Sequence, residues 1–181
     1  SEVGGHRRVM VEFVSANPTG PLSIGHGRQA ILGDGIARLL EATGHDVYRE
    51  YYYNDAGRQM RVLGESARAR YLELLGKEHE FPEDGYQGRY LEIMAQELLE
   101  QDPESIAQAA SAFADESFQR VQPPAGNAED WCRLPEDESV RSFSKYALLK
   151  ILSWQRDTCR RFGLRFSWRI VPFPIAQGAV D

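Results

Sequence analysis

The sequence is short of cysteine, of long apolar runs and of excess basic charge. Its two cysteines, Cys132 and Cys159, form no CxxC pair and have no neighbours with metal-ligand spacing, so we expect ordinary thiols in a reducing compartment and no metal site. No apolar run approaches the roughly 20 residues of a membrane span, and no signal peptide opens the chain. We therefore predict a cytoplasmic protein without a membrane partner.

The composition is that of an acidic globular domain. The net charge of −6 gives no global attraction for nucleic acid, which leaves only a local patch to bind RNA. The 181 residues, of which 42% are hydrophobic and 27% charged, suit one domain with its own core. We find no internal repeat and no low-complexity tract.

The most informative stretch runs from Val9 to Arg28. Its first part, Val9–Val14, is mostly β-branched and apolar, as in a buried strand, and the turn-forming run SANPTGP follows it. Ser23 is a good helix N-cap, and after it apolar residues recur at helical spacing: Ile24, Ile31, Leu32, Ile36, Leu39 and Leu40. The stretch therefore predicts a strand, a tight loop and the start of a helix.

This arrangement is typical of a phosphate site. A loop between a strand and a helix presents unpaired backbone N–H groups and the positive end of the helix dipole to a ligand above it. His26 falls in the first helical turn, and Gly25 and Gly27 carry no side chains that would keep a base or a phosphate at a distance. We therefore expect an anion at this loop.

The remainder of the chain predicts an α/β fold. A helix from Ser23 to Thr43, ended by Gly44, leads to a second strand at 46–53, so the first two strands should be parallel. Further helices are predicted at 58–75, 90–100, 106–121 and 139–162, with a loop at 77–88, an irregular stretch at 122–135 and a third strand at 164–171. The result is a parallel nucleus of about three strands, in residues 1–57 and 163–181, with a large helical insertion at 58–162. Ligands of such sheets bind beyond the carboxyl ends of the strands, where both the loop and the later Asn54–Gly57 turn should lie.

The residues around the first loop carry a resemblance to a known family. The string Ser23-Ile24-Gly25-His26, with Asn17–Leu22 before it and Gly27-Arg28 after it, resembles the HIGH signature of class I aminoacyl-tRNA synthetases. Glu12, Ser15–Asn17 and the Tyr52–Gly57 segment are similar to arginyl-tRNA synthetases in particular. The resemblance fades after about Phe166 and corresponds to the first half of such a catalytic domain. It implies a Rossmann-type (HUP-like) nucleus.

The resemblance also implies ligands and site residues. ATP, with Mg²⁺ accompanying it, would be the cofactor, and arginine and tRNA(Arg) would be partners of the parent enzymes. His26 and Ser23 would be catalytic, because activation builds charge on the α-phosphate of ATP that a donor must neutralise. The implied ATP-binding residues are Pro18, Thr19, Gly20, Pro21, Leu22, Ile24, Gly25 and Gly27. The implied arginine-binding residues are Glu12, Ser15, Asn17 and His26.

Plainer roles stay open for several of these residues. His26 could make only a local backbone bond at the helix start, and Ser23 could serve only as an N-cap. Ser15 and Asn17 could only brace the turn. The Asn54-Asp55 pair could orient a substrate or could merely form an Asx turn before the next helix.

Two departures from the family pattern leave two hypotheses. Ser23 stands where the pattern has its first histidine. No KMSKS loop, whose lysines clamp pyrophosphate, is found, because the nearest string, Ser142–Lys145, opens a long helix. The lysine that can compensate for a missing loop has no counterpart at Thr19–Leu22. The chain is therefore either a truncated relative or fragment of an arginyl-tRNA synthetase, impaired on its own, or a non-catalytic module that binds a nucleotide, an amino acid or a protein partner, including a second copy.

Overall fold

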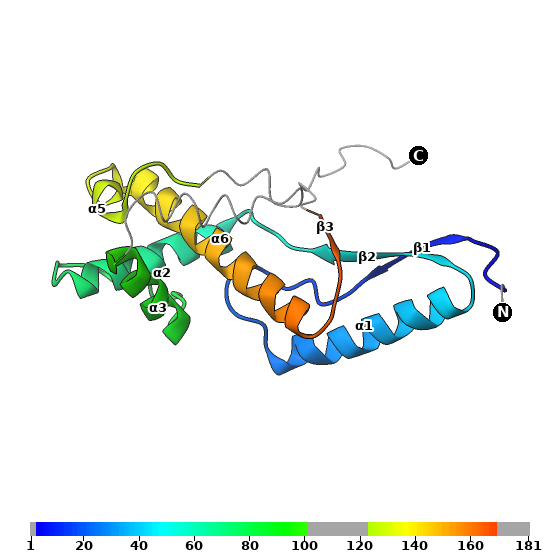
Figure 1. The fold of residues 1–181 in the computed structure, drawn as a ribbon. Coiled ribbons are helices and arrows are strands. Elements are labelled where there is room, and N and C mark those ends of the chain that lie inside the picture. The colour runs from blue at the N-terminus through cyan, green and yellow to red at the C-terminus, as the bar shows by residue number, and fades with distance from the viewer. Residues whose placement is uncertain (1–2, 101–122, 170–181) are drawn as a thin grey trace.

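The computed structural model describes residues 3–100 and 123–169, and these form an α/β fold (Figure 1). Three parallel strands make one sheet in the order β1 (Arg8–Glu12), β2 (Asp46–Tyr52) and β3 (Ser167–Arg169). The register places Glu12 of β1 opposite Glu50 of β2, which in turn lies opposite Ser167 of β3. The predicted parallel nucleus of three strands is confirmed, and the three carboxyl ends share one edge of the sheet.

Helices connect the strands in the predicted order. The helix α1 (Ile24–Ala42) joins β1 to β2, and the described part of the chain between β2 and β3 contains α2 (Arg58–Leu74), α3 (Arg89–Glu100), α5 (Ala128–Trp131) and α6 (Glu136–Arg161). In Figure 1, α2, α3 and α5 gather beyond the carboxyl end of β2, and α6 runs from this group back towards α1 and β3. The helix predicted at 106–121 lies outside the described residues.

Several element boundaries differ from the prediction by one to three residues, and two of the differences have a local reason. The strand β1 stops at Glu12 instead of Val14, because Val14 and Ser15 have positive φ angles of 70° and 37° and so leave the β region. The helix α6 begins at Glu136 instead of Ser139. Its first turn consists of acidic residues, which the positive end of the helix dipole favours.

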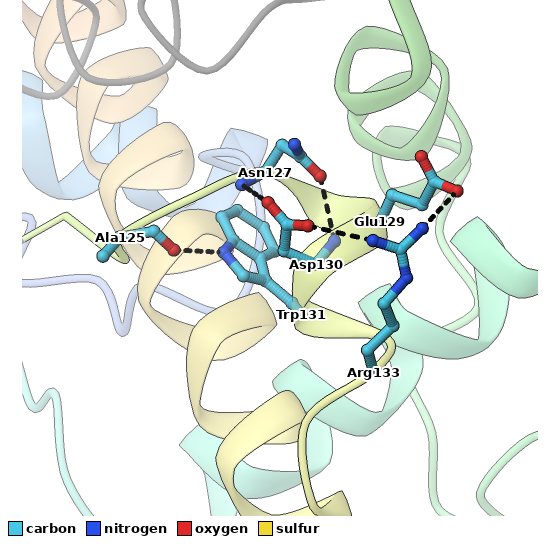
Figure 2. A network of polar contacts seen from close by, with 6 residues as sticks. All are labelled: Ala125, Asn127, Glu129, Asp130, Trp131 and Arg133. Atoms are coloured by element: carbon cyan, nitrogen blue, oxygen red, sulfur yellow. Dashed lines mark hydrogen bonds and ion pairs between the residues drawn. The ribbon is translucent and has the colours of Figure 1, made fainter.

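The stretch 122–135, predicted to be irregular, contains the short helix α5 (Figure 2). The side chain of Asn127 caps it, accepting a hydrogen bond through Oδ1 from the backbone N–H of Asp130 at 2.9 Å. Trp131 is buried, donates from Nε1 to the carbonyl of Ala125 at 2.7 Å, and meets the Phe143 ring edge-on with centroids 5.3 Å apart. The prediction is wrong here because a single turn is too short to produce a periodic pattern.

The core lies mainly between α2, α3 and α6. Its fully buried side chains include Leu63, Leu91, Phe143 and Ile151. The helices α2 and α6 approach so closely that a Cβ on Gly64 would lie 2.4 Å from the carbonyl oxygen of Val140. The apolar residues Leu148, Leu149, Ile151 and Leu152 of α6 are also buried.

The large apolar side chains of α1 face solvent in the described structure. The buried positions of this helix are the small residues Ala30, Gly33 and Ala37. The residues whose spacing predicts the helix lie mostly on the other side and are exposed: Ile24, Ile31, Leu32, Ile36 and Leu39. Small residues let the helix lie close to the strands, and the apolar pattern therefore marks its outer face.

Replacing both Leu32 and Leu39 by glutamine is expected to change the free energy of unfolding by less than about 1 kcal/mol, because both side chains already lie in water. The matched deletion Leu63→Ala in α2, where the leucine is fully buried, is expected to cost about 2–5 kcal/mol. Urea unfolding followed by circular dichroism measures both values. A cost from the double substitution as large as that of Leu63→Ala would contradict the exposed placement of this face.

Candidate functional site

The chain leaves β1 through a strained turn. Val14 and Ser15 are not glycines, yet both have left-handed φ angles, of 70° and 37°. Each such residue costs on the order of 1–3 kcal/mol, and residues of this kind cluster at functional sites. Val14 is also β-branched, for which this conformation is a genuine outlier. The strain therefore marks the turn after β1 as a candidate functional segment.

Ser15 links the carboxyl ends of β1 and β2. Its hydroxyl donates to Oε1 of Glu12 at 2.7 Å and accepts from the backbone N–H of Tyr52 at 3.1 Å. Glu12 is exposed, so its carboxylate faces water as well as Ser15. Two of the residues predicted to bind arginine thus lie together, and the Ser15 hydroxyl orients the Glu12 carboxylate.

The loop that follows is held by the helical insertion. Gln155 of α6 donates from Nε2 to the carbonyls of Asn17 and Gly20, at 3.1 and 2.8 Å. Tyr90 of α3 donates its hydroxyl proton to the carbonyl of Thr19 at 2.5 Å. Burial raises the pKa of Tyr90 to about 12, so the hydroxyl keeps its proton at neutral pH. Sequence reasoning missed both anchors, and the only available signal was a polar Gln155 amid the apolar pattern of its helix.

His26 makes the local bond that the plainer interpretation expected, and this bond fixes the state of its ring. Its Nδ1 accepts from the backbone N–H of Ser23 at 2.9 Å, and the Ser23 hydroxyl lies 2.9 Å from the same nitrogen. An Nδ1 that accepts carries no proton, so the neutral ring carries its proton on Nε2. Ser23 thus occupies the N-cap and orients an imidazole that retains one N–H donor.

The helix start is open and has no acidic side chain. No acidic residue lies in the first turn of α1, so nothing there opposes the positive end of its dipole. A Cβ on Gly27 would meet nothing within 4 Å, and one on Gly25 would meet only Oγ of Ser23, at 3.4 Å. The backbone at both glycines is therefore accessible to a ligand.

An apolar cavity of about 510 Å³ lies between this loop and the end of α6. On its wall lie Leu22 of the loop, the N-cap Ser23, and Ile24, His26 and Gly27 of α1, and α6 and its C-cap contribute Thr158, Cys159 and Phe162. Burial raises the pKa of the Cys159 thiol to about 11, so the thiol keeps its proton at neutral pH, and Arg28 of α1 is the residue on the wall that carries a fixed charge. A cavity of this size and character suits a small molecule with an apolar, flat part.

The cavity brings together only part of the predicted site. Pro18, Thr19, Gly20, Pro21 and Gly25 do not line it; Pro18 is fully buried within the chain, whereas Pro21 and Gly25 are exposed. Glu12, Ser15 and Asn17 lie along the strained turn instead. The structure thus separates an apolar cavity at the helix start from a polar group at the strand end.

Asn54 and Asp55 have different surroundings in the structure. Oδ1 of Asn54 accepts from the backbone N–H of Ala56 at 3.0 Å, which is an Asx turn. Asp55 lines a second cavity, of about 530 Å³, whose other charged residues are Arg61, Asp137, Arg141 and Lys145. The lysine of the Ser142–Lys145 string therefore lies beside this second cavity and not at the helix start.

Neither a metal site nor a membrane-spanning helix is found in residues 3–100 and 123–169. No three His, Cys, Asp or Glu side chains in these ranges come together in a way that could hold a metal ion. None of the helices there combines the length and the apolar character that crossing a bilayer demands.

Fold and site together define a class of protein. A parallel sheet with a glycine- and proline-rich loop and a helix N-terminus at the carboxyl end of its first strand is the design of nucleotide-binding α/β domains. Residues 1–127 match the family model described as tRNA synthetases class I (R), catalytic domain. The chain belongs to this family.

Curated relatives and a solved structure agree with the family model. The chain is 76% identical over 106 residues to an arginine–tRNA ligase of Desulfotalea psychrophila, which covers 59% of this chain and 19% of the relative. It is 41% identical over a 190-residue alignment to that of Thioalkalivibrio sulfidiphilus, covering 100% of this chain and 32% of the relative. The crystal structure of an arginyl-tRNA synthetase from Campylobacter jejuni superposes with a TM-score of 0.63 at 29% identity, over 91% of this chain and 30% of that one. The chain thus spans between a fifth and a third of the length of these proteins.

Proposed function

We propose that this chain forms the part of an arginine–tRNA ligase catalytic domain that binds ATP and arginine, and that it acts in the cytoplasm with the remainder of that domain. The parent reaction converts ATP, arginine and tRNA(Arg) to arginyl-tRNA, AMP and pyrophosphate. One observation carries the proposal: Ser23 holds His26 through Nδ1, which leaves the Nε2–H as a donor beside accessible glycines at the carboxyl edge of a parallel sheet.

ATP is proposed to bind over Gly25 and His26 with its phosphates towards the start of α1. Backbone N–H groups and the dipole at this end favour an anion, and the first turn offers no acidic side chain to repel it. The apolar cavity beside the loop would take the adenosine. Mg²⁺ would arrive on the phosphates, which are its usual ligands in such sites.

The role proposed for His26 is to stabilise the negative charge that builds on the α-phosphate of ATP. In the activation step a carboxylate oxygen of arginine bonds to the α-phosphorus of ATP, and the bond to the bridging oxygen of pyrophosphate breaks. Charge builds on the α-phosphate oxygens, and a preorganised donor such as the Nε2–H of His26 stabilises it without changing its own protonation. Ser23 is proposed to assist by fixing the ring, since its backbone N–H and hydroxyl both meet Nδ1.

Arginine is proposed to bind at the turn after β1. The Glu12 carboxylate, already oriented by the Ser15 hydroxyl, is the natural partner of a substrate ammonium group. Asn17 is exposed on the same turn, and its backbone is held by Gln155, so its side chain is available to the substrate. tRNA(Arg) would be bound mainly by the parts of the parent enzyme beyond this chain.

Gly25→Val is expected to weaken binding of a non-hydrolysable ATP analogue at least tenfold, or about 1.4 kcal/mol. The added side chain would stand over the phosphate position, while its Cβ meets only Oγ of Ser23, at 3.4 Å, so the fold should tolerate it. Gly35→Ala is the control, because a Cβ there lies in open space on the same helix. Isothermal titration calorimetry measures both, and equal affinities of wild type and Gly25→Val would contradict the proposed ATP position.

The second candidate is a binding module that holds ATP and arginine without activating them. The serine at position 23, where the family motif has its first histidine, favours this candidate. The exposed face of α1 also fits a protein that works against a partner, whether the rest of the catalytic domain or another copy. Binding of both ligands without arginine-dependent ATP–pyrophosphate exchange, even after the remainder of the domain is added, would select this candidate.

A further inference from the structure

Gln155 is a buried polar residue whose amide nitrogen donates hydrogen bonds to the loop before α1. It is 1% exposed and lies in the last third of α6. Nε2 donates to the carbonyls of Asn17 and Gly20, and Oε1 accepts from the Tyr51 hydroxyl at 2.9 Å. The Tyr51 hydroxyl is also 3.4 Å from the carbonyl of Ala16. A single side chain thus joins two loop carbonyls that are three residues apart in the sequence.

The orientation of the amide follows from its partners. A primary amide has two N–H donors on one side and one acceptor oxygen on the other. Two carbonyl oxygens require the donors, and the Tyr51 hydroxyl can donate to the oxygen, so the reverse orientation would set oxygen against two oxygens. The Tyr51 hydroxyl therefore fixes the orientation of the Gln155 amide. Burial raises the pKa of this hydroxyl, so it keeps its proton and can donate at neutral pH.

The loop has few backbone donors for its own carbonyls. Two of its six residues, Pro18 and Pro21, have no N–H to donate, and β1 has ended at Glu12, so no ladder continues. Gln155 serves Asn17 and Gly20, and Tyr90 serves Thr19. All three anchored carbonyls are therefore bonded to side chains of the helical insertion.

We propose that Gln155 is a positioning residue that sets the loop in the conformation which binds the substrates, with Tyr51 as the group that orients it. This inference rests on the proposed function of the loop. Gln155 is not among the residues that line the cavity, and it makes no printed bond to Glu12 or Ser15. It acts through the backbone carbonyls of Asn17 and Gly20, which flank the proposed arginine and ATP positions. The helical insertion thereby controls the geometry of a site that the first strand and helix supply.

The test compares three substitutions in the 181-residue chain. Gln155→Met keeps the side-chain volume and removes every hydrogen bond of the amide. Gln155→Glu keeps the acceptor for Tyr51 and removes both N–H donors. Tyr51→Phe keeps the N–H donors of Gln155 and removes the hydroxyl that orients the amide. We expect Gln155→Met and Gln155→Glu to weaken binding of the ATP analogue and of arginine at least about tenfold, and Tyr51→Phe to have a smaller effect. Gln96→Leu, at an exposed position of α3, is the control and should bind as wild type.

Two readouts separate positioning from simple loss of stability. Calorimetry is run well below the melting temperature of each variant, so the unfolded fraction does not set the affinity. Hydrogen exchange of the backbone N–H groups at 16–27 is measured in parallel, with the core N–H groups of α2 as reference, and only the loop should exchange faster in Gln155→Met. Wild-type affinity together with wild-type loop exchange in Gln155→Met would overturn the inference. If the wild-type chain binds no ATP analogue, the proposed function fails, and loop exchange alone decides whether Gln155 holds the loop.

Discussion

Gly33→Ala is expected to destabilise the chain by about 2–3 kcal/mol, although alanine is ordinarily the better helix residue. A Cβ at Gly33 would lie 2.2 Å from Cγ and 2.4 Å from Cβ of Phe13. Phe13 cannot easily yield, because its backbone N–H is bonded to the carbonyl of Glu50 at 3.2 Å and its ring packs on Phe166 with centroids 4.5 Å apart. The helix α1 would have to move away from the strands.

The matched control for this prediction lies on the same helix. Gly35→Ala adds the same methyl group where nothing lies within 4 Å, so it should stabilise the chain by up to about 1 kcal/mol through helix propensity alone. Urea unfolding of both variants measures the difference. Effects of the same sign at the two positions would show that α1 does not lie against Phe13 as described.

The second large effect concerns catalysis. The 181-residue chain alone is expected to catalyse arginine-dependent ATP–pyrophosphate exchange at least about a thousandfold more slowly than a full-length arginine–tRNA ligase. Removing one preorganised donor such as the first histidine of the motif typically costs about 2.7–4 kcal/mol, or 10²–10³ in rate. The absence of a pyrophosphate clamp should add to this loss, although such effects need not sum.

Ser23→His tests how much of the loss in exchange rate comes from the missing histidine and how much from the missing pyrophosphate clamp. It should raise exchange only slightly, because the clamp is still missing and because the new side chain no longer supplies the hydroxyl at Nδ1 of His26. Exchange or charging at rates of order 1 per second by the unmodified chain would contradict the prediction and would require an unrecognised lysine. Lys145 should then be tested before Lys150, because Lys150 is paired with Glu97 at 2.6 Å.

Much of the fold could be predicted because its signals are local. Gly44, expected to end its helix, has a positive φ, and so have Gly76 after α2 and Gly163 after α6; glycine adopts this conformation without strain. The strand, loop and helix around Ser23 form a contiguous segment, so backbone preferences and an N-cap were enough to predict them. The parallel pairing of β1 and β2 followed from the helix between them.

The sequence by itself thus determined the order of the elements apart from α5, the glycine that ends α1, the family signature and the location of the loop. Tertiary structure alone decided which face of α1 is buried, since periodicity gives a stripe but not its direction, and the close approach to Phe13 selected Gly33 and its small neighbours for the inner side. It also decided what holds the loop. Gln155 lies 135 and 138 residues from the carbonyls that it binds. A hydrogen bond between such distant groups exists only once α6 has packed against the sheet, so no local pattern could reveal it.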